Sequence, residues 1–131
     1  MPLSHEPLLA AAADAREHAQ AKYSGFAVGA ALETREGKIY SGCNIENVSY
    51  GLTLCAERVA LVKALSEGAR QFARIAIVTG GKKPAPPCGA CRQLLWEYCG
   101  DIDVISANPD GMEERHKLSD LFPHPFDASF L

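Results

Sequence analysis

Cysteine and glutamate side chains stand in two short stretches at spacings suited to metal chemistry. The stretch Thr-Leu-Cys-Ala-Glu-Arg places the thiol of Cys55 two residues before the carboxylate of Glu57. The stretch Pro-Cys-Gly-Ala-Cys-Arg supplies a C-x-x-C pair, Cys88 and Cys91. Three thiolates at about 2.3 Å hold a zinc ion tetrahedrally and leave its fourth position for water. A carboxylate beside that position can move protons for the water, so the set predicts a hydrolytic zinc site with Glu57 as proton carrier.

Two other interpretations of these thiols stay open on the sequence. A structural zinc site takes four protein ligands, and a C-x-x-C pair after a strand is also typical of thiol–disulfide proteins. The redox interpretation gives Cys55 and Glu57 no role, although Glu57 could be an exposed first-turn residue that complements the helix dipole. No second C-x-x-C or H-x-x-x-H pair is present, as a zinc ribbon or finger requires. The side chains available as a fourth ligand are Cys43, Cys99, His5, His18, His116 and His124.

Positive charge must accompany a zinc ion held by three thiolates. The ion and its ligands together are already negative, and ionising the bound water adds to that charge. Two helix N-termini aimed at the sulfurs are one compensating source. Arg58 is predicted to donate to the thiolates from outside the ligand set, as residues around zinc ligands commonly do. Arg92 follows Cys91 and is either a second such group or a solvated helix residue.

The elements that position these residues alternate between helix and strand. Apolar spacing and punctuating glycines predict helices over residues 7–21, 55–67 and 89–99, and strands over 26–34, 39–44, 74–79 and 103–108. Residues 112–117 are either a last strand or irregular, and 118–121 form a helical turn. Ser4 and Thr53 are the expected N-caps of the first two helices. Helix–strand alternation after Cys55 implies parallel pairing with right-handed crossovers, while the first two strands form a hairpin, so the sheet is mixed.

Length and charge narrow the classes of protein. A chain of 131 residues with 47% hydrophobic residues is the size of one domain and can bury a core. The net charge of -3 argues against a nucleic-acid partner. No run approaches the ~18 consecutive apolar residues of a membrane span, so no membrane partner is expected. The N-terminus lacks the features of a signal peptide, so we expect a cytoplasmic protein whose five cysteines are reduced.

These motifs resemble a known family, the cytidine deaminases. The resemblance rests on Cys-Ala-Glu (55–57) and Pro-Cys-Gly-Ala-Cys-Arg-Gln (87–93), and extends to residues 26–32, 44–47 and 49–51. It covers roughly residues 23–126. Cys55 stands where many zinc deaminases have histidine, which is similar to the short homotetrameric branch with a three-cysteine zinc site. The resemblance implies an α/β fold, a three-layer α/β/α sandwich with a mixed, mostly parallel β-sheet.

The resemblance also implies roles for individual residues around the substrate. Asn44 and Glu46 would bind the ribose hydroxyls, since a carboxylate and an amide on one loop can grip a diol. Phe26 would stack on the pyrimidine, and the backbone of Ala56 with the Glu57 carboxylate would read the base edge. Phe26 and Phe126 could also be ordinary core residues, and Asn44 an ordinary turn residue.

The resemblance also implies roles for residues of neighbouring subunits and for residues around the zinc ligands. Tyr50 and Phe126 would reach it from neighbouring subunits, and Arg58 and Gln93 would surround the zinc ligands. The implied activity of the single catalytic domain 1–131 is hydrolysis of cytidine and 2′-deoxycytidine to the uridines and ammonia, in pyrimidine salvage. It would use one Zn²⁺ per subunit in a homotetramer. The alternatives are a deaminase of a nucleoside antibiotic such as blasticidin S and a non-catalytic structural-zinc module.

Overall fold

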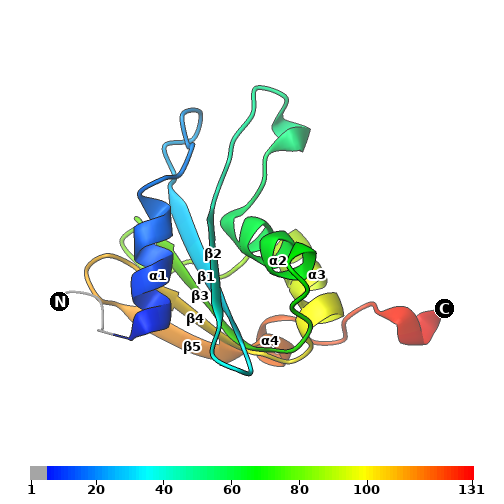
Figure 1. Ribbon diagram of the computed structural model, residues 1–131. Coiled ribbons are helices and arrows are strands. Elements are labelled where there is room, and N and C mark those ends of the chain that lie inside the picture. The colour runs from blue at the N-terminus through cyan, green and yellow to red at the C-terminus, as the bar shows by residue number, and fades with distance from the viewer. Residues whose placement is uncertain (1–5) are drawn as a thin grey trace.

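A five-stranded sheet separates two layers of helices in the computed structural model, which describes residues 6–131 (Figure 1). One helix covers one face of the sheet, and two helices cover the other (Figure 1). The predicted three-layer α/β/α sandwich is therefore confirmed. The strands are β1 (Val28–Thr34), β2 (Ile39–Cys43), β3 (Phe72–Thr79), β4 (Asp103–Ala107) and β5 (Glu113–Lys117). The helices are α1 (Pro7–Arg16), α2 (Ala56–Ser66), α3 (Gly89–Cys99) and the short α4 (Leu118–Leu121), with 3-10 turns at Tyr50–Leu52 and Ala128–Phe130.

The sheet is mixed as predicted, but the expectation that it is mostly parallel is wrong. The strand order is β2-β1-β3-β4-β5, and only the β3–β4 pair is parallel. Strands β2 and β3 run in the same direction, because each pairs antiparallel with β1. The helix between them, α2, therefore makes a crossover between parallel-running strands, but β1 lies between those strands and separates them. The alternation of helices and strands along the chain correctly predicts that β2 and β3 run in the same direction, but it does not reveal that β1 lies between them.

Strand β3 lies at the centre of the sheet and is buried on both faces from Ile75 onward. Successive side chains of a strand point to opposite faces, and here Ile75 and Ile77 pack with α2 and α3. Ala76 and Val78 pack with α1 on the other face. Burial on both sides explains why this strand reads as a continuous apolar run rather than an alternating one.

Two glycines allow the helices to lie directly on the sheet. A Cβ atom at Gly29 of β1 would lie 1.9 Å from the carbonyl oxygen of Ala12 in α1. A Cβ atom at Gly42 of β2 would lie 2.7 Å from the backbone nitrogen of Ala60 in α2. Both neighbours are backbone atoms of packed helices, so no side chain can turn away to make room. The depth at which α2 sits on the sheet therefore depends on the missing side chain of Gly42.

Helix α1 ends at Arg16 rather than at the predicted residue 21, because the chain beyond it is used for tertiary pairing. The backbone nitrogen of Gln20 donates to the carbonyl of Asn44 at 2.9 Å, and the carbonyl of Gln20 accepts from Glu46 at 2.9 Å. The predicted cap Ser4 lies outside the described residues, and the N-cap position is Glu6, whose side chain makes no capping bond.

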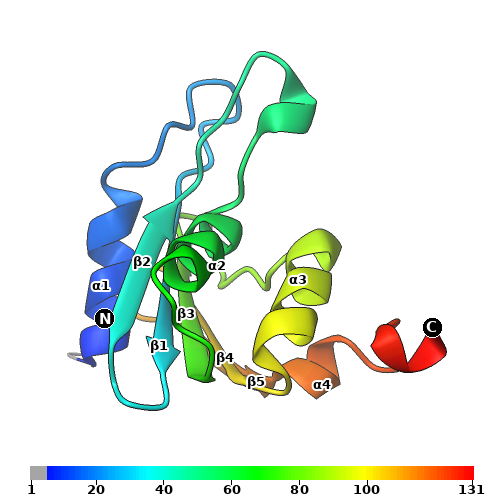
Figure 2. The same ribbon diagram turned by 45° about the vertical axis from the view of Figure 1, so that its right-hand side comes forward.

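The loop between β2 and α2 leaves and re-enters the body at one point. The backbones of Ile45 and Leu54 exchange two hydrogen bonds of 2.9 Å, which close the intervening loop as it projects from the sheet (Figures 1 and 2). Closure brings Cys55 close to Asn44, and Cys55 rather than the predicted Thr53 is the N-cap of α2. No helix within residues 6–131 is long and apolar enough to cross a membrane.

We expect Gly42→Ala to destabilise the protein, because the new methyl group would displace α2 from β2. Overpacking of this kind costs about 1–3 kcal/mol of unfolding free energy, measured by denaturant or thermal unfolding. The matched control is Gly51→Ala, which adds the same methyl group where no atom lies within 4 Å. Equal stability of the two variants would show that α2 can shift without cost.

Candidate metal centre and substrate cavity

Two helix N-termini bring three cysteine sulfurs together beside the sheet. Cys55 is the N-cap of α2, Cys88 is the N-cap of α3, and Cys91 lies in the first turn of α3. All three sulfurs lie within 4.8 Å of one another, and the Cys55 and Cys88 sulfurs are 4.0 Å apart. Ligands at about 2.3 Å from a tetrahedral zinc ion lie about 3.8 Å from one another. The spacing therefore fits a single zinc ion with little adjustment.

The cluster offers three ligands among the residues that the structure describes. Cys43 and Cys99 are separate free cysteines and do not belong to it. His18, His116 and His124 also lie outside the cluster, and His5 is outside the described residues. A three-ligand set is the pattern of catalytic zinc sites, which keep one position open.

The electrostatics of the thiols also suit a cation. Hydrogen bonding from Cys91 lowers the pKa of Cys55 most, and further hydrogen bonds from Cys88 and Arg58 add to this. The pKa of Cys91 is raised, because its thiol is hydrogen-bonded to Cys55 and buried. Crowding thus lets one thiol ionise at the expense of another. A dication among the sulfurs removes this competition, since coordinated thiols are deprotonated outright.

Arg58 lies where it can stabilise negative charge on sulfur. Its Nη2 atom donates to the sulfur of Cys55 at 3.9 Å. Its Nε atom is buried and has no hydrogen-bond partner among residues 6–131. The guanidinium group therefore keeps a donor free next to the cluster.

Glu57 is a buried carboxyl group in the first turn of α2, with 6% of its surface exposed. Burial, reinforced by negative charge on Cys55, raises the pKa of Glu57 to about 7. The interpretation of Glu57 as an exposed residue that complements the helix dipole is therefore wrong. A carboxyl group with a pKa near neutrality can both take up and release protons, which is what a proton carrier requires.

A cavity of about 260 Å³ opens beside Glu57 and the cysteines. Phe26 and Ala56, both predicted to contact the substrate, line it, and Phe26 keeps 45% of its surface exposed. The wall is largely apolar, with Val28 and Ile77 contributed by adjacent strands. A small apolar cavity with few polar groups is typical of a small-molecule site. Its other lining residues are Ser24, Asn44, Glu46, Thr53, Leu54, Cys55, Thr79, Ala85, Pro86 and Cys88.

Asn44 and Glu46 line the cavity, and both also hold the backbone around it. The Asn44 amide accepts from the backbone nitrogen of Val28 at 2.9 Å and donates to the carbonyl of Phe26 at 2.8 Å. The Glu46 carboxylate accepts from the backbone nitrogens of Tyr23 and Ser24 at 2.9 and 3.0 Å, and from the Ser24 hydroxyl. These bonds fix the segment that carries Phe26 against the loop that follows β2.

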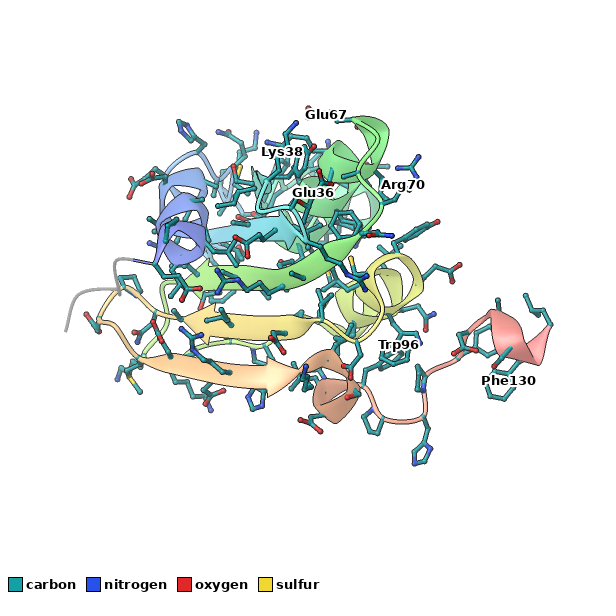
Figure 3. All side chains as sticks on the ribbon, turned by 60° about the horizontal axis from the view of Figure 1, so that its bottom comes forward. Glu36, Lys38, Glu67, Arg70, Trp96 and Phe130 are labelled. Atoms are coloured by element: carbon teal, nitrogen blue, oxygen red, sulfur yellow. The ribbon has the colours of Figure 1, made fainter. Side chains whose placement is uncertain are left out.

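Three predicted site residues lie away from the sulfur cluster of this chain. Tyr50 lines an adjoining cavity of about 330 Å³, with its ring 6.3 Å from that of Tyr23. The Gln93 amide donates to the carbonyl of Phe126 at 2.8 Å rather than to a sulfur. Phe126 stacks on Phe130 in the C-terminal tail, which extends away from the body (Figure 3).

Sequence reasoning missed the residues that hold the loop before Cys88. The side chain of Asn108, which is fully buried, donates to the carbonyls of Gly81 and Lys82 and accepts from the nitrogen of Met112. Arg92 was left between two interpretations, and neither is what the structure shows. Its guanidinium donates to the carbonyls of Pro87 and Leu121.

Residues 3–106 match the family model described as the cytidine and deoxycytidylate deaminase zinc-binding region. The chain belongs to this family. A cytidine deaminase of Halalkalibacterium halodurans is 48% identical over 127 residues, which cover 96% of each chain. A blasticidin-S deaminase of Bacillus cereus is 35% identical over 104 residues, covering 73% of this chain and 74% of that protein.

Solved structures of the deaminase family share the fold. A crystal structure of cytidine deaminase from Burkholderia pseudomallei has a TM-score of 0.90 and 47% identity, and covers 95% of this chain and 100% of that one. The zinc ion expected from the three cysteines is therefore the cofactor of a deaminase of this type.

We expect this deaminase to bind about one zinc ion per chain, as the single three-sulfur cluster found within residues 6–131 requires. Cys88→Ser and Cys91→Ser should each weaken zinc binding by more than the ~10–100-fold typical of losing an outer partner. The readout is metal content by mass spectrometry after dialysis against a graded chelator. Cys43→Ser is the matched control and should retain the metal. Full zinc content in Cys91→Ser would mean that the ion is held elsewhere.

Proposed function

We propose that this chain catalyses the zinc-dependent hydrolysis of cytidine and 2′-deoxycytidine to uridine and 2′-deoxyuridine with release of ammonia. The observation that carries the proposal is the cluster of Cys55, Cys88 and Cys91, with sulfurs within 4.8 Å of one another, beside the buried carboxyl group of Glu57. The family to which the chain belongs and the names of its relatives support the same reaction.

In the proposed reaction, the three cysteines hold the metal and Glu57 moves the protons. Zinc bound there would lower the pKa of a water molecule and so supply the nucleophile for C4 of the pyrimidine ring. Glu57 takes one proton from that water and delivers it to the ring nitrogen. It then moves the second proton, from the new hydroxyl group at C4, to the leaving amine. Arg58 holds negative charge on the sulfur of Cys55, to which it donates at 3.9 Å.

The cavity accounts for recognition of a pyrimidine nucleoside. Phe26 offers an exposed aromatic face for stacking on the base, and the backbone of Ala56 lies beside Glu57 to contact the base edge. Asn44 keeps one amide hydrogen that its bond to Phe26 does not use, and the Glu46 carboxylate has further lone pairs. We propose that these two groups bind the ribose hydroxyls.

We propose that the active protein is a homotetramer in which neighbours complete each site. The loop after β2 exposes Val48 (74%), Tyr50 (77%) and Leu52 (67%), and apolar side chains gathered at the surface in this way are typical of a protein–protein contact. Phe126 and Phe130 are exposed. The C-terminal tail that carries them projects from the body (Figures 2 and 3). A tail of this shape can reach another subunit, which is the position proposed for Phe126. Gln93 supports this arrangement by fixing the carbonyl of Phe126.

The physiological setting follows from the same chemistry. Three thiols that bind zinc must stay reduced, so we propose a cytoplasmic protein. We propose that conversion of cytidine to uridine serves pyrimidine salvage. We treat residues 1–131 as one catalytic domain. The proposed partner is a small nucleoside, rather than a nucleic acid or a membrane.

A second substrate class is a nucleoside antibiotic such as blasticidin S. The relative of that name from Bacillus cereus motivates the comparison, with 35% identity over 104 residues. Purified protein should be given cytidine and blasticidin S side by side, with ultraviolet change and ammonia as readouts. We expect turnover of cytidine to dominate, and preferential turnover of the antibiotic would reverse the assignment.

We expect Glu57→Gln to lower kcat by about 10²–10⁴-fold while the protein keeps its zinc, because the amide cannot carry protons. The matched control is Glu67→Gln at the exposed end of the same helix, which should remain fully active. Normal turnover by zinc-loaded Glu57→Gln would remove the proton role.

We expect activity to depend on assembly, and subunit complementation tests this directly. Phe126→Ala should lower activity, and co-expression of Phe126→Ala with Glu57→Gln should restore part of it. Restoration would occur because a subunit with intact Glu57 then receives Phe126 from its neighbour. Sedimentation should show tetramers, and dilution to monomers should abolish turnover. Active monomers, or mixtures no more active than either variant alone, would contradict shared sites.

A further inference from the structure

A buried hydroxyl group without a partner lies at the end of the central strand. Thr79 is the last residue of β3 and has 2% of its surface exposed. Its Oγ1 atom makes no hydrogen bond with any part of the chain from residue 6 to 131. Burying an unpaired hydroxyl lowers stability, and nearly all buried polar atoms in folded proteins are paired. The placement of this hydroxyl therefore requires an explanation.

Thr79 belongs to the wall of the cavity that contains Glu57 and Cys88. Side chains alternate along β3, so Thr79 shares a face with Ile77, which also lines the cavity. On the neighbouring strand β1, Thr79 is paired with Val28, which also lines the cavity. The hydroxyl is thus a polar atom in an otherwise apolar part of the wall.

Two other buried side-chain atoms among the described residues lack a partner, and their positions differ from that of Thr79. The Nε atom of Arg58 lies beside the metal centre. The hydroxyl of Ser106 is on β4, paired with Ile77, and Ser106 does not line the cavity. Thr79 alone of the three combines an unpaired hydroxyl with the wall of the cavity, so a bound molecule can supply its missing partner.

We propose that the Thr79 hydroxyl hydrogen-bonds to the polar edge of the pyrimidine ring and helps to position it, which rests on the proposed deaminase function. A hydroxyl both donates and accepts by rotating about its C–O bond. Deamination exchanges the hydrogen-bond donor and acceptor on that edge. The amino group, a donor, becomes a carbonyl acceptor, and the bare ring nitrogen, an acceptor, becomes an N–H donor. A rotating hydroxyl can bond to either form, whereas a fixed donor such as a lysine cannot.

The decisive substitution is Thr79→Val, which removes the hydroxyl and keeps the shape. The variant should be at least as stable as the wild type in thermal unfolding, because the free protein loses an unpaired buried group. Its kcat/KM for cytidine should fall by about fivefold, as expected for one hydrogen bond of ordinary net strength. The inhibition constant for uridine should rise by a similar factor, while zinc content stays unchanged. Thr79→Ser retains the hydroxyl and should keep most of the wild-type kcat/KM.

Ser106→Ala is the matched control, because it removes a buried unpaired hydroxyl from the same face of the sheet outside the cavity. It should change stability only. Wild-type values of kcat/KM and uridine inhibition in Thr79→Val would overturn the inference. If Thr79→Val fails to fold, Thr79→Ala and Thr79→Ser give the comparison, and equal uridine affinity of these two would also overturn it. Failure of the wild type to deaminate cytidine would instead refute the proposed function.

Discussion

The convergence of three sulfurs at two helix N-termini is the constraint on which the other features depend. Thiolates this close repel one another unless positive charge accompanies them. The helix ends of α2 and α3, the guanidinium of Arg58 and a zinc ion supply that charge. Each source requires accurate placement, because a helix end or a guanidinium group acts on a charge only at short range. The sheet serves this placement by holding both helices on one face, and Gly42 lets α2 lie directly on β2.

Accurate placement of the loops comes from side chains that bond to backbone rather than to one another. Asn44 ties β1 to the chain beyond β2, and Asn108 ties the end of β4 to the loop before Cys88. Arg92 donates to the carbonyl of Pro87, the residue that precedes Cys88. Amide and guanidinium groups suit this work, because each offers several hydrogen bonds in a fixed plane. Loops held in this way can carry binding groups with nearly the precision of the sheet itself. Asn44 and Glu46 show both uses, since they line the cavity while they fix its edge.

Local signals predicted much of this arrangement, and non-local contacts account for what they missed. The bounds of α3 follow from a C-x-x-C pair, apolar spacing and a closing glycine, and they match the prediction. Helix α1 is shorter than its composition predicts, because the backbone of Gln20 pairs with Asn44 and Glu46. No residue near Gln20 in the sequence signals this contact. The position of β1 between β2 and β3 likewise cannot be predicted from the alternation of helices and strands along the chain. The hydrogen bonds of Asn108 could not be predicted either, since an asparagine at the end of the predicted strand 103–108, before a Pro-Asp-Gly turn, gives no sign of the distant loop that it holds.

Buried polar atoms without partners point to a binding surface where they also line a cavity or border a metal centre. A sheet that only supported helices would be most stable with apolar side chains at every buried position, as a hydroxyl there contributes a desolvation cost and no bond. In the described chain, three buried polar atoms have no partner: the Nε atom of Arg58 beside the metal centre, the hydroxyl of Thr79 in the cavity wall, and the hydroxyl of Ser106 on β4 outside the cavity. The first two lie where a bound ion or molecule changes the environment of the side chain. Stability sacrificed at such positions in the free protein is recovered on binding, so the unbound structure already indicates where its ligands make contact.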